Sequence, residues 1–116
     1  MSNNSPSKAI RLTHENGGST LTKTGKVVNQ NHGYIVGGFS ESILPEHCTV
    51  NDFANAWNSK RDECNDSECV GTWTHEGKIY FDVVRIYDDK ETAIKIARAN
   101  KEIAIFDLSS KKSINV

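Results

Sequence analysis

Two aspartates stand inside otherwise apolar stretches, and they are the side chains best suited to acid–base chemistry. Asp82 lies within Lys-Ile-Tyr-Phe-Asp-Val-Val, and Asp107 lies within Ala-Ile-Phe-Asp-Leu. On neighbouring strands the pair could share a face, and burial with mutual repulsion would then raise both pKa values. The residue types favour the alternative that each carboxylate points to solvent, or binds a loop amide or Arg85. A small enzyme using Asp82 and Asp107 is therefore the third reading of function.

Other catalytic and ligand-binding patterns are missing from the sequence. The cysteines Cys48, Cys64 and Cys69 form no C-x-x-C pair, and their odd number favours free thiols, although Cys64 and Cys69 flank a turn and could pair under oxidation. Cys48 follows His47, but adjacency in sequence does not make two side chains face each other. The glycines of residues 33–38 flank a strand and do not lead into a helix. We predict no catalytic residue, no metal site and no cofactor.

Charge is unevenly distributed along the chain. Residues 41–76 carry eight acidic and two basic side chains, although the whole chain has a net charge of −1. Binding to nucleic acid normally needs a concentrated basic surface, so this pattern argues against it. It favours a basic protein surface as the partner, and the segment holding Asp62, Glu63, Asp66 and Glu68 could mimic phosphate charge. The plainer alternative is a solvated acidic face.

Local sequence signals place these residues on alternating strands and helices. The expected elements begin with a strand at 33–39, a connection at 40–45, a helix from a Thr49 cap to about 60–63, and a hairpin of strands at 69–74 and 78–87 with its tip at 75–77. A second helix, capped by Asp88 and Asp89 and stopped by a left-handed Asn100, and strands at 102–108 and 111–116 follow. Towards the amino terminus, strands at 9–13 and 20–23 flank a glycine turn and form an expected hairpin.

This order predicts an α+β fold. From residue 33 it matches the split β-α-β-β-α-β (ferredoxin-like) arrangement, an antiparallel sheet with two helices on one face, here with extra N- and C-terminal strands. Residues 1–8 are expected to be a flexible tail, and residues 9–116 a single domain. The composition, 36% hydrophobic and 25% charged, is typical of a globular chain. The apolar runs are too short to span a bilayer, so the expected location is the cytoplasm.

The carboxy-terminal half carries a pattern of glycine, aromatic and apolar residues. Its main segments are Gly71-Thr72-Trp73, Gly77 to Val84, and Glu102 to Leu108. Together with the segment beginning at Gly33, this pattern resembles small uncharacterised proteins of phages and mobile elements over residues 33–108. The resemblance brings no known activity. It implies a phage accessory protein acting in the host cytoplasm, with an anti-defence inhibitor such as an anti-CRISPR protein as one expectation.

Helices on one side of a sheet leave the other face open to a partner, and Tyr and Trp often dominate protein interfaces. The residues expected near such a surface are Trp73, His75, Glu76, Tyr80 and Asp82. With Lys78, the aromatic residues could instead stack on nucleic-acid bases, which the acidic middle of the chain opposes. We therefore expect a non-enzymatic protein that binds and occludes a host protein, such as part of a nucleic-acid-handling complex. The alternatives are a small-ligand or nucleotide-binding protein and a homodimer through the open face.

Overall fold

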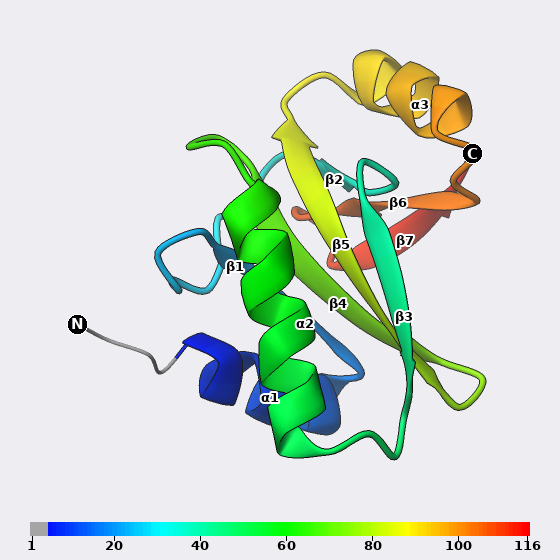
Figure 1. The fold of residues 1–116 in the computed structure, drawn as a ribbon. Helices are drawn as coiled ribbons and strands as arrows, with labels where there is room; N and C mark the ends of the chain where they lie inside the picture. Colours follow the sequence, from blue (N-terminus) through cyan, green and yellow to red (C-terminus); the bar gives the residue numbers. More distant parts are fainter. Residues whose placement is uncertain (1–4) are drawn as a thin grey trace.

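The computed structural model describes residues 5–116, which form three helices and seven strands (Figure 1). In chain order these elements are α1 (Ser5–Asn16), β1 (Gly18–Thr22), β2 (Tyr34–Val36), β3 (Glu41–Pro45), α2 (Val50–Glu63), β4 (Cys69–His75), β5 (Lys78–Tyr87), α3 (Lys90–Ala99), β6 (Ala104–Asp107) and β7 (Lys112–Asn115).

All strands belong to one antiparallel sheet organised around β5. The strand order is β1-β4-β5-β2-β6-β7, and β3 pairs with β5 on the same side as β2. The order β6-β2-β5-β4, with α2 and α3 as the crossovers, is that of a split β-α-β-β-α-β unit. The predicted α+β class is therefore confirmed, with β1 added at one edge of the sheet and β7 at the other.

The strand before α2 is interrupted, and this break shapes the sheet. Val36 pairs with Arg85, and Glu41 pairs with Asp82, so residues 37–40 oppose only two residues of β5. The prediction of a connection at 40–45 is wrong, because residues 41–45 form β3. Pro45 argues against a strand in the sequence, because a proline is tolerated in a strand only where its nitrogen needs no hydrogen-bond partner in the sheet, as on an edge.

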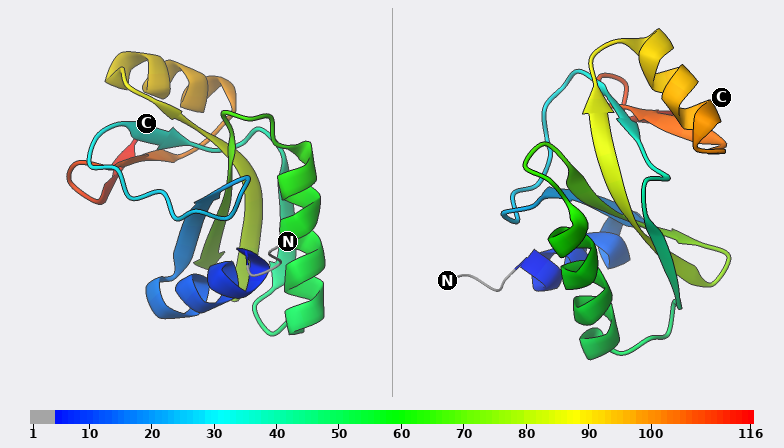
Figure 2. Two further views of the ribbon diagram at one scale, coloured as in Figure 1. Left: turned by 90° about the vertical axis from the view of Figure 1, so that its left-hand side faces the viewer. Right: turned by 45° about the horizontal axis from the view of Figure 1, so that its top comes forward.

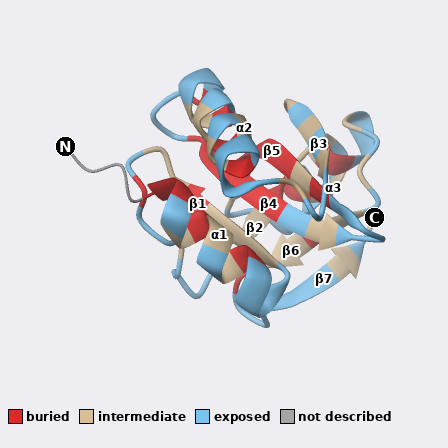
Figure 3. Cartoon of the chain, turned by 60° about the horizontal axis from the view of Figure 1, so that its bottom comes forward, coloured by how far each residue is buried: buried red, intermediate tan, exposed pale blue. Residues whose placement is uncertain are grey.

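The helices lie on one face of the sheet and cover two core clusters. The side chains of β5 that alternate towards this face include Ile79, Phe81 and Val83, which pack with Phe53 and Trp57 of α2. Further along the sheet, α3 packs on β2 and β6 through a second cluster formed by Val36, Ala93, Ala97 and Ile105. Figure 2 shows α2 along one side of the sheet and α3 across its upper end, and Figure 3 shows the buried residues concentrated between α2 and β4–β5.

Trp57 provides a test of this core. The side chain is fully buried, and its Nε1 has no hydrogen-bond partner among residues 5–116. Trp57→Phe therefore breaks no hydrogen bond within this part of the chain and leaves a ring in place. We expect it to lower the free energy of unfolding by no more than about 1.5 kcal/mol, against about 3–5 kcal/mol for truncation of a buried Trp to alanine. Urea denaturation of the two variants would check this, and equal losses would contradict it.

The amino-terminal prediction is wrong for the first strand of the expected hairpin, whereas the strand expected at 20–23 overlaps β1. Residues 5–16 form α1, not a tail and a strand, and residues 1–4 of the expected tail lie outside the described residues. Ala9 and Thr13, four residues apart, form the buried face of the helix, and the Thr13 hydroxyl bonds to Thr72 of β4 at 2.7 Å. The strand β1 consequently pairs with β4, and through a single bridge from Leu21 to Val27, but not with residues 9–13. Pro6 in the first turn suits a helix start as well as a tail.

The turns carry smaller corrections. The β4–β5 hairpin turns at Glu76 and Gly77, both with positive φ, as the glycine there predicts. Of the two aspartates expected to cap α3, Asp89 is the cap and accepts from the Thr92 amide, whereas Asp88 is not. Asn100 is not left-handed; that conformation falls on Lys101, one residue later.

Candidate functional site

Three side chains from neighbouring strands form a row on the helix-free face of the sheet. Trp73 pairs with Tyr80, and Tyr80 pairs with Ile43, so β4, β5 and β3 each contribute one member. Alternation along β5 places Tyr80 opposite Phe81, which faces α2. Trp73 and Ile43 are each 48% exposed. We call Trp73, Tyr80 and Ile43 the aromatic row; it is an apolar surface that no element within residues 5–116 covers.

The ring of Trp73 is held in place by its neighbours. It stacks on His75 with ring centroids 4.8 Å apart, and its centroid lies 5.6 Å from that of Tyr80. His75 Nε2 lies 3.5 Å from a carboxylate oxygen of Glu76 at the exposed hairpin tip. The hairpin thus brings together four of the residues predicted at the partner surface. Ile43 was missed, because Glu-Ser-Ile-Leu-Pro has no alternation of apolar and polar residues and its strand is identified by its pairing with β5.

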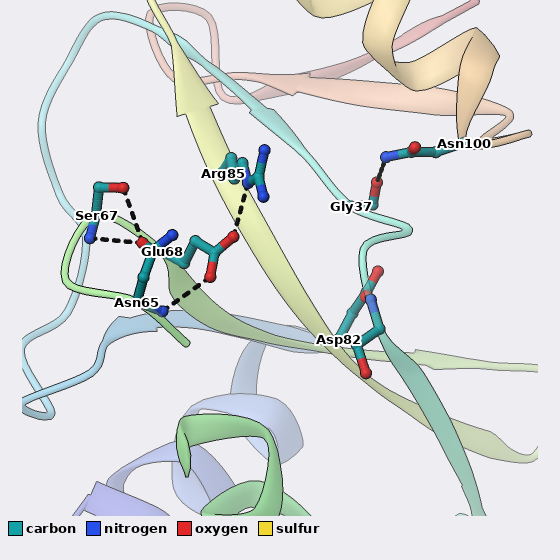
Figure 4. A network of polar contacts seen from close by, with 8 residues as sticks. Gly37, Asn65, Ser67, Glu68, Asp82, Arg85 and Asn100 are labelled. Atoms are coloured by element: carbon teal, nitrogen blue, oxygen red, sulfur yellow. Dashed lines mark hydrogen bonds and ion pairs between the residues drawn. The ribbon is translucent and has the colours of Figure 1, made fainter. Parts of the chain in front are cut away.

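Asp82, also predicted at this surface, is buried and serves the fold. Its carboxylate accepts hydrogen bonds from the amides of Gly38 at 2.5 Å and Ser40 at 3.2 Å, which fixes the break between β2 and β3. Figure 4 shows Asp82 on β5 beside this break. Burial raises the pKa of Asp82, although these amides oppose the shift. With 7% of its surface exposed, Asp82 cannot be a main contact for a partner.

The proposed acid–base pair of Asp82 and Asp107 does not form. The strand β2 lies between β5 and β6, so the two aspartates are not on neighbouring strands. Asp107 instead accepts a hydrogen bond from the Ser109 amide at 2.9 Å. Each carboxylate binds a loop amide, which is the simpler of the two sequence interpretations.

Two further carboxylates, Glu41 and Glu102, lie close enough to Asp82 to be affected by its charge. The pKa of Glu102 is raised by burial and then by Asp82 and Glu41, and the pKa of Glu41 is raised by burial and by Asp82. The Lys60 ammonium lowers the pKa values of Glu41 and Asp82 only in part, and it donates to Ser40 Oγ at 2.9 Å and to Glu63 at 3.2 Å. The exposed side of this group, beside β3, therefore keeps excess negative charge.

These shifts predict an unusual pH dependence of stability. Glu41, Asp82 and Glu102 bind protons more tightly in the folded protein than in the unfolded chain, so they stabilise the fold at acidic pH and this contribution is lost as the pH rises through their raised pKa values. We expect the free energy of unfolding to fall between the ordinary carboxyl range and neutral pH, and Glu102→Gln to flatten this slope. Denaturation at a series of pH values tests this, and a steady rise over the same range would contradict it.

Two of the four acidic side chains at residues 62–68 are engaged within the fold. Glu68 is buried and accepts from Arg85 Nε at 2.7 Å and from the Asn65 amide at 2.8 Å, which lower its pKa (Figure 4). Glu63 accepts from the Ser40 hydroxyl and from Lys60. Asp62 and Asp66 remain exposed. The prediction that Glu68 lies at a partner surface is therefore wrong, because its carboxylate is buried and paired with Arg85, which is distant in sequence.

The hollows and thiols give little support to chemistry at another site. Two adjoining hollows of about 30 and 170 Å³ lie between α1, α2 and the turn end of the β4–β5 hairpin, and both are smaller than ligand pockets of roughly 300–1,000 Å³. The cysteines are free thiols, and burial raises the pKa of Cys64 to about 11. Residues 5–116 bring together no cluster of three or more His, Cys, Asp or Glu side chains arranged for a metal ion.

Comparison of the chain with models of known protein families gives no match, and comparisons with curated protein sequences and with solved structures give no significant match. Among the helices of residues 5–116, none is both long enough and apolar enough to cross a membrane. The functional interpretation therefore depends on the geometry of the helix-free face.

Proposed function

We propose that this protein is a non-enzymatic binding module that uses its helix-free face to bind and occlude another protein. The observation that carries the proposal is the aromatic row, in which Trp73 and Ile43 are half exposed on either side of Tyr80. Large aromatic side chains with a fixed orientation are the usual anchors of protein interfaces. The stacking of Trp73 on His75 provides that orientation before binding.

The charges around the aromatic row favour a basic protein over nucleic acid. Glu41 and Glu76 are exposed beside the row, whereas Lys78 is the single exposed base on the paired strands β4 and β5 next to it. A phosphate backbone would be repelled by this surface, and a patch of Lys and Arg would be attracted to it. The partner that fits is thus a basic protein surface, such as that of a protein that itself handles nucleic acid.

The resemblance of residues 33–108 to small phage and mobile-element proteins supplies a setting for this activity. In that setting the module acts in the host cytoplasm, and covering the basic surface of a host defence protein would block its access to nucleic acid. An anti-CRISPR-like inhibitor is one member of this class. The same surface chemistry serves any target whose function depends on an exposed basic patch.

Affinity capture from nuclease-treated host lysate tests the proposal when face variants are compared. The wild-type protein should retain one basic protein at equal stoichiometry, and high salt should weaken the capture. Trp73→Ala should lose it. Ile103→Ala should retain it, because Ile103 is 75% exposed but lies outside the aromatic row. Equal capture by both variants would reject the proposal. Capture from untreated lysate alone, with none from nuclease-treated lysate, would also reject it.

A further inference from the structure

The strand β3 is an open edge beside the aromatic row. Within residues 5–116 it pairs with β5 alone, and Figure 1 shows it at the margin of its half of the sheet. The Ser40 carbonyl accepts from the Val83 amide, and the Glu46 amide donates to the Gly77 carbonyl. Backbone groups that face a partner strand alternate along an antiparallel strand. The even-numbered residues of β3 therefore face β5.

The odd-numbered residues of β3 consequently direct their backbone groups away from the sheet. Ile43 presents both an N–H and a C=O to this edge, and Glu41 does the same. The edge closes at Pro45, which has no N–H and whose carbonyl already accepts from the Cys48 amide at 3.0 Å. The open part of the edge is thus the short stretch from Glu41 to Ile43, and natural sheets usually protect such stretches from pairing.

The side chains along this edge define what could pair with it. Ile43 is apolar, 48% exposed and next to Tyr80 on the helix-free face. Glu41 points to the same face two residues away, beside the carboxylates of Asp82 and Glu102. A strand added here would meet an apolar side chain at one position and uncompensated negative charge two residues further along.

We propose that an extended segment of the partner adds to β3 as a further strand, with an apolar residue opposite Ile43 and a Lys or Arg opposite Glu41. Main-chain hydrogen bonds to Ile43 supply binding, and the two side-chain positions supply selectivity. This inference rests on the proposed function, since it describes how a basic partner reaches the aromatic row. A second copy of the chain pairing through β3 is the competing occupant.

Proline at position 43 isolates the backbone contribution. Ile43→Pro removes an N–H that faces away from β5, so the bonds between β3 and β5 remain. Ile43→Val is the matched control, because it keeps the N–H and an apolar side chain. The probe is the short capped peptide Ser-Val-Thr-Val-Thr-Lys-Ser. In an antiparallel arrangement with its second Val opposite Ile43, its Lys lies opposite Glu41. The same peptide with Glu in place of Lys is its control.

Binding is measured by NMR titration of the labelled protein, with amide hydrogen exchange of Ile43 as a second readout. The Lys peptide should slow exchange of the Ile43 amide in the wild-type protein and bind Ile43→Pro about tenfold more weakly, as expected for the loss of main-chain hydrogen bonds. Ile43→Val should bind within about twofold of wild type, and the Glu peptide should bind more weakly. Unchanged exchange at Ile43 in the wild-type protein would overturn the inference even if Ile43→Pro failed to fold.

Two other outcomes separate this inference from the proposed function. If light scattering shows a wild-type dimer that Ile43→Pro dissociates, the occupant of β3 is a second copy and the inference is wrong. If Trp73→Ala loses the captured host protein while Ile43→Pro retains it, the helix-free face binds the partner but the β3 edge does not. Retention by both variants would reject the proposed function itself.

Discussion

Replacing Asp82 with alanine is expected to lower the free energy of unfolding by about 2 kcal/mol. The substitution removes the acceptor for the amides of Gly38 and Ser40, which hold the break between β2 and β3. It also removes a nearby negative charge from the buried Lys60 ammonium. The shift in the urea midpoint, with an unchanged dependence on denaturant, would measure this loss.

Asp107 supplies the matched control for that experiment. It too lies in an otherwise apolar stretch, but its side chain binds a single loop amide, that of Ser109. Asp107→Ala should therefore cost about 0.5–1 kcal/mol, clearly less than Asp82→Ala. Equal losses at the two positions would mean that the amides at the strand break do not depend on Asp82.

Replacing Trp73 with alanine is expected to weaken the complex with the captured partner about 30-fold, an effect typical of an aromatic residue at the centre of an interface. Trp73 is half exposed, so its truncation should destabilise the fold less than truncation of the fully buried Trp57. Its ring is already oriented by His75 and Tyr80, so little side-chain entropy is lost on binding. Calorimetric titration of purified partner would measure the change.

Ile103→Ala is the control for Trp73→Ala, because it removes an exposed apolar side chain of 75% exposure outside the aromatic row. Its affinity should match that of the wild-type protein. A loss of affinity shared by both variants would indicate a general effect of surface hydrophobicity. A loss at Ile103 alone would move the interface to the loop between α3 and β6.

The parts of the fold that the sequence predicts are those with strong local signals. Thr49 and Asp52 form a capping box at the start of α2, and Glu76-Gly77 makes a tight turn that fixes the β4–β5 register. Because that register is local, the sequence also indicates that Trp73 and Tyr80 share a face. The small residues Ala93 and Ala97 likewise predict the buried stripe of α3.

The parts that the sequence does not predict depend on distant contacts. The segment 9–13 fits either a strand or a helix, and the bond from Thr13 to Thr72 is specific to the helix. The short strand β3 is identified by its pairing with β5 and not by its composition. Strand order decides that β2 separates Asp82 from Asp107, and no local pattern reports strand order.

Of the sequence features, the distribution of charge along the chain was the poorest guide to the surface of the folded protein. The acidic character of residues 62–68 suggested a phosphate-like surface, yet Arg85 neutralises Glu68, and Ser40 and Lys60 engage Glu63. Sequence counts assign every carboxylate to the surface, whereas the structure shows which of them have internal partners. Exposed carboxylates remain in this segment at Asp62 and Asp66, and elsewhere beside β3 at Glu41 and at the hairpin tip at Glu76.

The most direct test of the central claim is fluorine NMR of the Trp57→Phe protein labelled with fluorinated tryptophan. The chain has two tryptophans, so this variant reports on Trp73 alone, and an unlabelled partner contributes no signal. If the helix-free face is the binding surface, adding the captured partner should shift the Trp73 resonance and abolish its sensitivity to a soluble paramagnetic probe. A complex that forms while the Trp73 resonance and its sensitivity stay unchanged would contradict the claim.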